Sequence, residues 1–541
     1  MDEHHKNQQL EHPFQQLLGG RQADLGEVCE PQPEEKQEFE PVNWAFDGEG
    51  VGDDRSRAGI RDPWYSRPLD VHRWSEHPEL VGLVERLWNS LCADLDREKS
   101  GGPKPRQSFQ NQLRVLLLDL YVAWLEDPDL CIGISMNARS WETGSRYNAL
   151  RLSKKITVLV QRLGEAGVIE ASRGSYAGPG AAGNRTTRIR AARSLREQFA
   201  ALKADREAVH QVEGQECIIL KDGDGEAARQ VEYDDTADTN RMRSELQAYN
   251  ALLASSFINL PALDVPWIER DDAFGRRVKV HIDRHHQFTR RIFSRGRWDM
   301  NGRFYGPWWQ SIGSRDRAGI FINDVPTVEV DFKGLHLAIL AAEQAVPLEG
   351  DPYYLPEGTL PGVAAQEQRG MVKHLVLTTL NAKSRKAAFA SFRSDYPKGH
   401  VGKGMTDQDL DRVLDLLIEG RPWLADSLGA DVGIRLMYKD SLIAERVLNH
   451  FTRQGIPILC IHDSFIIDWT RGAELKRVMA EASEAVVGRF LPVESKAVGL
   501  DEVAGEWPKH VVLDLIAWRQ VPRSEGYLNR LAAWEKRSGA L

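Results

Sequence analysis

Two short apolar segments that each reach an aspartate constrain the fold of this chain more than any other feature. The first, PTVEVDFKGLHLAIL over residues 326–340, is β-branched up to Asp331 and then continues as an apolar helical stretch. The second, IPILCIHDSFIIDW over residues 456–469, has apolar residues on both sides of His462-Asp463. These patterns predict a strand that ends at Asp331, a helix after it, and a β-hairpin with His462 and Asp463 at its turn.

A third segment, RGMVKHLVLTTLNAKSRKAAF over residues 369–389, has the pattern of a helix. Arg369 and Lys373 are four positions apart, so a helix places them on the same face. Two cations on one face suit a triphosphate, because arginine grips phosphate oxygens through its planar fork and lysine acts as a point charge. The segment therefore predicts a phosphate-binding helix.

Two carboxylates carried by separate strands can share two Mg²⁺ ions, and Mn²⁺ accepts the same oxygen ligands. Such a pair of ions activates a hydroxyl and stabilises the leaving oxygen of an in-line displacement at phosphorus. With Asp331 and Asp463 as the metal ligands, Arg369 and Lys373 are suited to hold the departing pyrophosphate. The chemistry that this combination predicts is nucleotidyl transfer.

In this order the three segments resemble motifs A, B and C of the family A DNA polymerases and of the related single-subunit phage-type RNA polymerases. The residues that carry the resemblance are Asp331-Phe332-Lys333-Gly334-Leu335-His336-Leu337, Arg369-x3-Lys373 and His462-Asp463-Ser464-Phe465-x-x-Asp468. The resemblance implies that Asp331 and Asp463 bind the metals, and that His462 is a catalytic residue near the primer end or the metals. It implies that Arg369 and Lys373 contact the nucleotide's phosphates. The fold that it implies is α+β, a right-hand-like polymerase palm with helical fingers.

The same resemblance brings three further residues to the nucleotide. His336 stands where the DNA enzymes carry a bulky Glu that blocks the ribose 2′-hydroxyl and the RNA enzymes carry a small residue. The bulk of His336 favours dNTPs, as does Asp468, whereas Ser464-Phe465 is closer to the RNA enzymes. Leu377 and Asn381 occupy the positions of an aromatic residue and of a Tyr-Gly pair, which stack on or gate the nucleotide in those families.

An aromatic-rich segment, RFYGPWWQSI over residues 303–312, follows several arginines. It resembles the basic Arg-Val-Tyr segment upstream of motif A in the phage-type RNA polymerases. Arginines interleaved with aromatic rings can hold a nucleic-acid strand by charge and stacking. Arg303 and Tyr305 are therefore candidate nucleic-acid contacts, with Arg303 facing the template. The alternative is a core cluster that buries Trp308 and Trp309.

A basic region precedes the catalytic segments. Residues 145–174 have the pattern of two helices, Gly167 and a short strand, and TTRIRA after a Gly/Ala/Pro loop predicts a second strand. That order, with ten basic and three acidic residues between positions 140 and 194, is typical of a DNA-binding winged helix-turn-helix. A winged helix that contacts only protein is the alternative. The candidate DNA contacts are Arg146, Lys154, Lys155, Arg185, Arg188 and Arg190.

These patterns divide the chain into four parts. Residues 1–70 are polar and are expected to form a largely disordered or extended arm. Residues 71–195 are expected to form the helical region with the winged helix-turn-helix, and residues 196–262 a linker with a strand and a helix. Residues 263–541 are expected to form the palm and fingers of the catalytic domain.

The composition excludes several other classes of protein. With 42% hydrophobic and 28% charged residues, the 541-residue chain suits neither a coiled coil nor a wholly disordered protein. Its five separated cysteines form no CxxC zinc pair, and no GxxxxGK[ST] phosphate loop is present. No apolar run reaches the ~18 residues of a membrane span, and the polar N-terminus has no secretory pattern. A cytoplasmic location without membrane contact is expected.

The leading hypothesis is a template-directed DNA polymerase that joins dNTPs to a 3′-hydroxyl by a two-metal mechanism, with a DNA template and primer as partners. Its setting would be DNA replication, for which a plasmid, phage or integrated mobile element suits such a stand-alone enzyme. One alternative is a single-subunit RNA polymerase or primase. Another is a catalytically inactive DNA-binding replication or regulatory protein, which the unusual Asn381-Ala382 favours.

Overall fold

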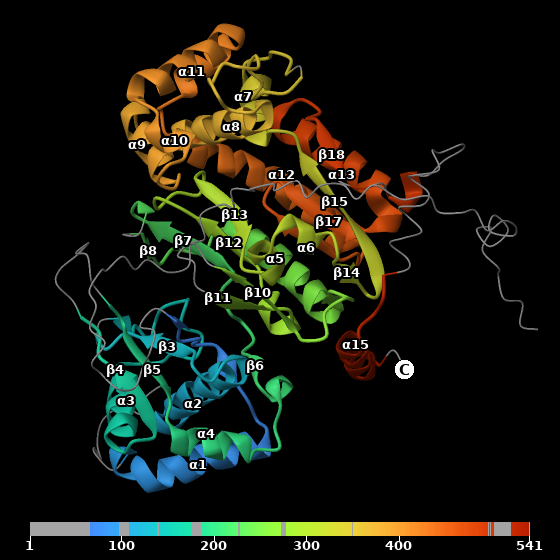
Figure 1. Cartoon of the computed structure of the whole chain (residues 1–541). Helices are drawn as coiled ribbons and strands as arrows, with labels where there is room; N and C mark the ends of the chain where they lie inside the picture. Colours follow the sequence, from blue (N-terminus) through green and yellow to red (C-terminus); the bar gives the residue numbers. More distant parts are fainter. Residues whose placement is uncertain are drawn as a thin grey trace, which may run out of the picture. The chain divides into compact units, whose positions relative to one another are not determined.

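The computed structural model describes residues 65–96, 108–137, 140–175, 185–225, 228–271, 277–348, 350–495, 497, 499–502 and 521–539. Within these ranges the fold is mixed α/β (Figure 1), and none of their helices has the length and apolar character needed to cross a membrane. Residues 1–64 of the predicted arm lie outside the described ranges. At the end of that stretch, Ser66–Pro68 forms strand β1, which pairs in parallel with strand β3 (Cys131–Ile134).

The N-terminal part of the described chain has an apolar core of its own. Its elements are β1, β2 (Arg73–Trp74), α1 (Pro78–Leu91), η2 (Ala93–Asp96), α2 (Phe109–Glu126), β3 (Cys131–Ile134), α3 (Lys155–Glu165), β4 (Ile169–Ser172), β5 (Thr187–Ala191) and α4 (Arg193–Ala200). One sheet has the strand order β1-β3-β5-β4. Leu83, Leu117 and Leu159 bury the apolar faces of α1, α2 and α3 in this core, as their helical spacing requires.

The first of the two helices predicted in residues 145–174 is absent, and residues 145–153 form turns. The Asn148 side chain accepts from the Leu152 N–H at 2.9 Å and donates to the Leu152 carbonyl at 2.8 Å. Asparagine side chains that bond the nearby backbone in this way compete with helix formation. Arg151, with φ of 52°, is in the left-handed region, which a continuous helix excludes.

The predicted linker joins the larger core. Its elements are η4 (Arg206–Ala208), β6 (His210–Gln211), β7 (Ile218–Asp222), β8 (Arg229–Gln230), α5 (Ala237–Ser255) and β9 (Ile258–Asn259). β7 lies inside a sheet of order β13-β12-β7-β8, parallel to β12. Leu220, Leu246 and Tyr249 are buried in the same cluster as the residues around Asp331. The strand and the helix expected in this stretch are β7 and α5, and their apolar residues pack in the large core instead of forming a separate linker.

The central sheet has the strand order β16-β17-β15-β14-β9, with β18 paired to the end of β15. The further strands are β14 (Phe321–Ile322), β15 (Val325–Phe332), β16 (Ile458–Ile461), β17 (Ser464–Asp468) and β18 (Val493–Ser495). The predicted strand at Asp331 is β15, the predicted hairpin is β16–β17, and the predicted helix after Asp331 is α7 (Leu335–Glu343). All three local predictions are confirmed.

A group of helices follows α7 in the chain and packs together beside α12 (Figure 1). The elements are α8 (Ala365–Asn381), α9 (Arg385–Ser394), α10 (Val401–Gly404), α11 (Asp407–Gly420), η8 (Pro422–Ser427) and α12 (Gly433–Arg453). The predicted phosphate-binding helix is α8, which ends at Asn381. A new helix starts after Ser384, whose hydroxyl accepts from the Ala387 N–H.

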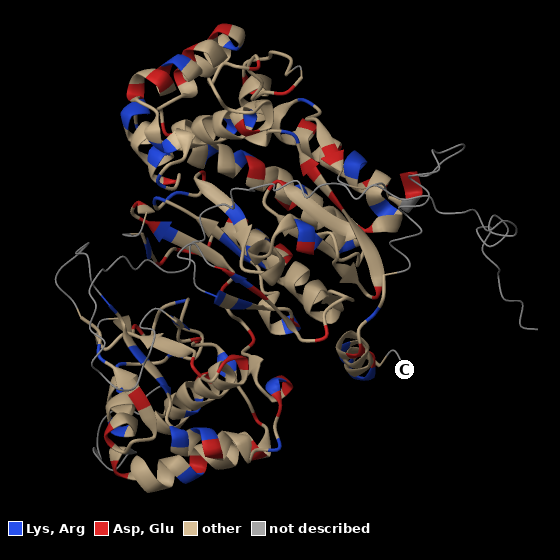
Figure 2. Cartoon of the chain, viewed as in Figure 1, with Lys and Arg blue, Asp and Glu red and all other residues tan. Residues whose placement is uncertain are grey.

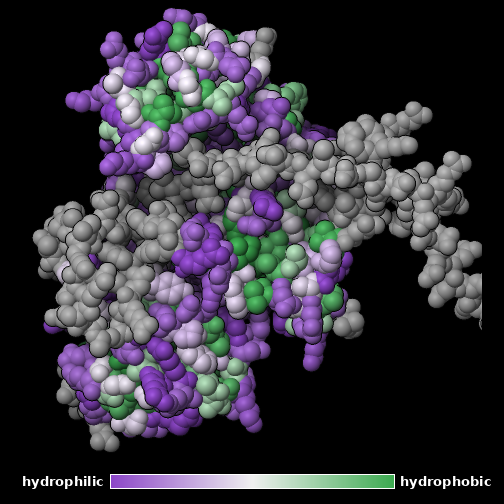
Figure 3. All heavy atoms as spheres, in the orientation of Figure 1, coloured by the Kyte–Doolittle hydropathy of each residue, from purple (hydrophilic) through white to green (hydrophobic). Residues whose placement is uncertain are grey.

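The remaining elements complete the fold. They are β10 (Trp267–Asp271), β11 (Arg277–His281), η6 (Arg284–His286), β12 (Arg290–Phe293), β13 (Asn301–Tyr305), η7 (Trp308–Ser311), α6 (Ser314–Arg317), η9 (Trp469–Arg471), α13 (Gly472–Val487), η10 (Leu500–Glu502) and α15 (Glu525–Ser538). Trp308 and Trp309 are buried, as the core-cluster alternative predicts. Hydrophilic residues cover much of the described surface seen in Figure 3, with a hydrophobic area near its middle.

Candidate active site

The end of β15 and the β16–β17 turn bring the two predicted metal ligands together. Asp331 pairs in register with Ser464, and the Phe332 N–H donates to the Asp463 carbonyl at 3.2 Å. His462, with φ of 57°, supplies the left-handed first residue of the two-residue turn between Ile461 and Ser464. The sheet therefore holds Asp331, near the end of β15, beside Asp463 in the β16–β17 turn.

The pKa of the Tyr353 hydroxyl is sensitive to the charged side chains near this end of β15. Burial raises the pKa of Tyr353 well above its usual range, and the negative charges of Asp463 and Asp331 raise it further, while Arg369 opposes them. A single phenol thus experiences both aspartates and the arginine of α8. Gly334, with φ of 56°, permits this approach, because a Cβ there would lie 2.9 Å from Pro352, next to Tyr353.

The two aspartates fit a divalent metal of the Mg²⁺ type by their chemistry. Mg²⁺ is commonly held by one or two carboxylates, with water and substrate phosphate as the other ligands. Among the described residues no group of three or more His, Cys, Asp or Glu is arranged to enclose a metal.

Glu329 on β15 supports the β16–β17 hairpin from within the sheet by a hydrogen bond and an ion pair. Glu329 lies two positions before Asp331 on β15, so both side chains project from the same face. Its carboxylate accepts from the Ser464 hydroxyl at 2.9 Å and pairs with Arg317 at 3.2 Å. Sequence reasoning missed Glu329, although its period-two spacing from Asp331 was a usable signal.

Arg303 does not have the free, template-facing guanidinium that was predicted. Its Nε donates to the Asp440 carboxylate at 2.5 Å, and its Nη2 lies 3.1 Å from Nε2 of His336. Gly302, with φ of 82°, lets β13 approach α12, because a Cβ there would lie 2.7 Å from the Ser441 hydroxyl. Arg303 is held here because the buried Asp440 carboxylate needs a charged partner, and the Arg303 guanidinium supplies it.

Burial and the charge of Arg303 shift the pKa values of its two neighbours, Asp440 and His336. Burial raises the pKa of Asp440 to about 6, where Arg303 acts to lower it and Asp463 to raise it. Burial and the neighbouring Arg303 lower the pKa of His336 to about 3. His336 is therefore a neutral, 8% exposed side chain, not an open surface of the site.

His462 and Tyr305 pack on each other beside the turn. Their ring centroids are 5.1 Å apart in an edge-on arrangement. Burial and the charge of Arg303 lower the pKa of His462 to about 3. The Tyr305 hydroxyl donates to the Asn301 side chain at 3.2 Å. Tyr305 thus supports His462, and its contact with nucleic acid stays a prediction.

The four predicted residues of α8 differ in their surroundings. Arg369 is exposed and pairs with Asp351 at 2.5 Å, and Lys373 is exposed. Leu377 packs against the large core, and the Asn381 side chain donates to the Leu377 carbonyl at 2.8 Å. Lys373 thus has the accessibility that the phosphate-binding prediction needs, and Arg369 is accessible but paired with Asp351, which a phosphate would have to displace. Leu377 and Asn381 are engaged within the protein.

The predicted DNA contacts of the N-terminal part also differ in how far their side chains are paired or buried. Arg146 pairs with Asp235 at 3.0 Å and Arg190 with Glu170 at 2.7 Å. Arg188 is 6% exposed. These three predictions are not supported, because carboxylates already pair with Arg146 and Arg190, and Arg188 is too buried to reach a DNA phosphate.

The other three N-terminal candidates remain predictions. Lys154 is exposed at the start of α3, and Lys155 lies over the Phe109 ring at 4.0 Å. Arg185 bonds Ser175 through its backbone. Figure 2 shows that basic and acidic residues are interspersed over both the N-terminal part and the helices α9 and α11.

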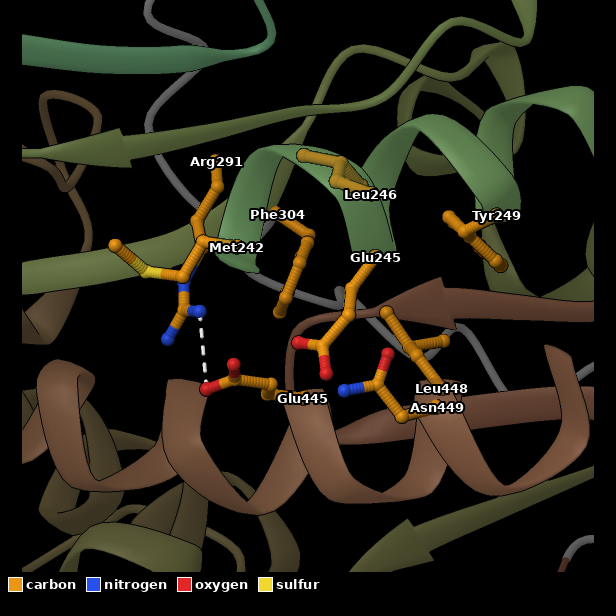
Figure 4. Close-up of a pocket in the computed structure, with 9 residues that line it drawn as sticks. All are labelled: Met242, Glu245, Leu246, Tyr249, Arg291, Phe304, Glu445, Leu448 and Asn449. Carbon is orange, nitrogen blue, oxygen red and sulfur yellow. Dashed lines mark ion pairs between the residues drawn. The ribbon is translucent and has the colours of Figure 1, made fainter. Parts of the chain in front are cut away.

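A separate small pocket lies between α5, α12 and the β12–β13 pair (Figure 4). It is lined by Met242, Glu245, Leu246, Tyr249, Arg291, Phe304, Glu445, Leu448 and Asn449. Inside it the buried Arg291 pairs with Glu445 at 3.0 Å. None of the predicted site residues lines this pocket, and its ion pair joins β12 to α12.

The chain was compared with protein families, curated proteins and solved structures. No family model and no curated protein matches the chain. Among solved structures, the chain is similar to the polymerase domain of Pol1 from M. smegmatis, determined in complex with DNA primer-template and dNTP. The identity is 11%, the TM-score is 0.26, and the match covers 48% of this chain and 50% of the other. The chain thus spans about half the length of that domain.

Proposed function

We propose that this protein is a template-directed DNA polymerase that transfers nucleotidyl groups from dNTPs to a primer 3′-hydroxyl. The observation that carries the proposal is that the pairing of β15 with β17 places Asp331 beside the turn that carries Asp463. Two carboxylates from adjacent strands beside a basic helix face are what in-line displacement at phosphorus requires. In this proposal β15 and β16–β17 belong to a palm, and α8–α11 act as fingers.

Asp331 and Asp463 would hold two divalent ions, which supply Lewis-acid stabilisation of negative charge when bound. The primer hydroxyl gives up its proton to solvent water and forms a new bond to the α-phosphorus of the dNTP, while the bond from that phosphorus to the pyrophosphate oxygen breaks and pyrophosphate leaves. Arg369 and Lys373 bind the pyrophosphate oxygens and oppose their growing charge. Glu329 and Arg317 keep the hairpin in place, so that Asp463 stays beside Asp331.

The testing experiment is extension of a labelled primer on a DNA template with Mg²⁺, with dNTPs and rNTPs in parallel. The proposal expects dNTP-dependent extension that disappears when the metal is chelated. Extension from rNTPs, above all without a primer, would favour the RNA polymerase or primase alternative that Ser464-Phe465 suggests. DNA binding without extension on any template would make the protein a binding factor instead.

Replacing Lys373 with alanine is expected to lower kcat/KM for dNTPs by about 10- to 100-fold. The reason is that a charge-assisted contact to phosphate contributes about 1.5–3 kcal/mol, and each 1.4 kcal/mol is about tenfold. Arg369→Lys, which keeps the charge and loses the fork, is expected to have a smaller defect than Arg369→Ala. Steady-state kinetics measure both. Lys386→Ala, at an exposed position of α9, is the control.

We further propose that the N-terminal part binds DNA through α3 and the β4–β5 hairpin as a winged-helix-like unit. The strand order β3-β5-β4 and the helix α3 that precedes the hairpin support this proposal. Lys154→Ala is expected to weaken DNA binding at all sequences alike, and to reduce the salt slope of log K by about 1. Fluorescence anisotropy at several salt concentrations tests this. Arg193→Ala is the matched control, and an equal loss in that variant would count against the assignment.

A further inference from the structure

The loop between α7 and α8 places a carboxylate on one of the two proposed phosphate-binding cations. Asp351 lies in this loop, and Arg369 lies in the second turn of α8. The Arg369 Nε donates to one carboxylate oxygen of Asp351 at 2.5 Å, and its Nη2 donates to the other at 3.1 Å. Arginine grips phosphate with the same two parallel bonds. The donors that a nucleotide phosphate needs are therefore already in use.

Several contacts hold this loop in place around Asp351. The Asp351 carbonyl accepts from the Arg421 guanidinium at 2.9 Å and from the Tyr354 N–H at 3.2 Å. The Asp351 carboxylate also accepts from the Tyr353 N–H at 3.1 Å. The Tyr353 side chain is buried, and a Cβ at Gly334 would lie 3.5 Å from its ring. The loop is thus anchored beside the turn between β15 and α7, and it presents Asp351 to α8.

The ion pair is open enough to be exchanged for a ligand. The Arg369 side chain is 51% exposed and the Asp351 side chain 30%. Ion pairs at such exposure are weak, because water solvates both partners. A triphosphate carries more negative charge and more acceptor oxygens than one carboxylate, so it is the stronger ligand for the same two donors. Lys373, exposed on the same face of α8, adds a second cation for it.

We propose that Asp351 competes with the phosphates of the dNTP and of pyrophosphate for Arg369, and so sets how tightly the site holds both. The inference rests on the proposed polymerase function and adds a residue to it. Asp351 occupies Arg369 in the empty site, leaves it when a dNTP binds, and returns as pyrophosphate departs. No covalent bond changes, since one acceptor replaces another on the same N–H groups. Asp351 thereby lowers the affinity for both ligands and favours product release.

The test measures binding of inorganic tripolyphosphate to the full chain with Mg²⁺ present, by isothermal titration calorimetry. Asp351→Asn removes the charge and keeps an oxygen for the Tyr353 N–H, so the loop is expected to keep its fold. The Kd for tripolyphosphate is expected to fall by about two- to fivefold, the range that corresponds to an ion pair of this exposure. Asp351→Ser also offers an oxygen to that N–H, and it repeats the comparison should Asp351→Asn fail to fold.

The same factor is expected for the ligands of the reaction. Displacing Asp351 costs the same for every ligand that uses Arg369, so its removal strengthens the binding of each alike. The Kd for dNTP on a complex with a blocked primer is expected to fall by the factor found with tripolyphosphate. The inhibition constant of pyrophosphate in primer extension is expected to fall by that factor as well.

Two further variants separate competition for Arg369 from a general loss of negative charge. In the Arg369→Ala protein, adding Asp351→Asn is expected to leave the Kd for tripolyphosphate unchanged, because the contested donors are gone. Glu343→Gln is the matched control. Glu343 forms the same two-bond pair with Arg435, at 2.6 and 2.9 Å, between α7 and α12. Its loss is expected to leave the Kd of the parent.

The outcomes keep this inference and the polymerase proposal apart. An Asp351→Asn protein that binds tripolyphosphate no more tightly than the parent overturns the competition, and primer extension by the parent still supports the polymerase. Tighter binding that persists in the Arg369→Ala background also overturns the competition, because charge alone then explains it. Tighter binding only where Arg369 is present, in a chain that extends no primer, supports the competition for phosphate and overturns the polymerase proposal.

Discussion

Asp331→Asn and Asp463→Asn are each expected to lower kcat for primer extension by about 1,000-fold while preserving the fold. Each substitution keeps the shape of the side chain and removes one of the two charges that would bind the metals. A loss of about 4 kcal/mol of transition-state stabilisation corresponds to a factor of about 1,000. Single-turnover extension with saturating dNTP measures the chemical step directly, and thermal unfolding checks the fold.

The matched control for these variants is Asp426→Asn. Asp426 is an exposed carboxylate in η8, on a different element from both aspartates. It is expected to keep full activity. Undiminished extension by the Asp463→Asn protein at any Mg²⁺ concentration would contradict the proposed metal site. A defect that excess Mg²⁺ or Mn²⁺ partly restores would agree with it, because a weakened ligand set binds metal less tightly.

Glu445→Gln is expected to destabilise the part of the chain that contains β12 and α12 by about 3–5 kcal/mol. Glu445 pairs with Arg291 at 3.0 Å, and Arg291 is 2% exposed. Burial lowers the pKa of Arg291, which shows that the environment disfavours its charge and that Glu445 compensates for it. Removing one partner of a buried pair leaves an uncompensated charge, whose cost exceeds the value of an exposed ion pair. Urea unfolding followed by tryptophan fluorescence measures the loss.

Two further variants make this prediction specific. Arg241 pairs with Glu445 from a half-exposed position, so Arg241→Ala is expected to cost at most about 1 kcal/mol. The double variant Arg291→Met with Glu445→Leu removes both charges and is expected to be more stable than Glu445→Gln alone. Equal stability of Glu445→Gln and the parent would show that the pair contributes nothing.

Local elements were the most predictable part of this protein. β15, α7 and α8 follow from alternation or from three- and four-residue spacing, which act over a few neighbouring residues. The N-terminal residues 145–153 were predicted as a helix because the contacts of the Asn148 side chain with its own backbone are not visible in an apolar pattern. The place of the strand expected in the linker was not predictable for a related reason, since only packing reveals that β7 lies inside a sheet.

The sequence alone determined which segments form the edge of the candidate site. Apolar runs up to Asp331 and around His462-Asp463 specify a strand and a hairpin, whose aspartates end beside each other once the strands pair. The four-residue spacing of Arg369 and Lys373 specifies a basic helix face. These are properties of the backbone and of short-range periodicity.

Only the tertiary structure decided which side chains support that edge. Arg303 and Asp440 are 137 positions apart, and no local pattern links them. Their contact exists because β13 packs on α12 through Gly302, where a larger residue would collide with Ser441. Because of the same packing, Arg303 contacts Asp440 and His336 inside the protein, whereas the sequence predicted a contact with the template. Long-range burial assigns such roles, because a charged group that loses water must find its partner wherever the fold brings one.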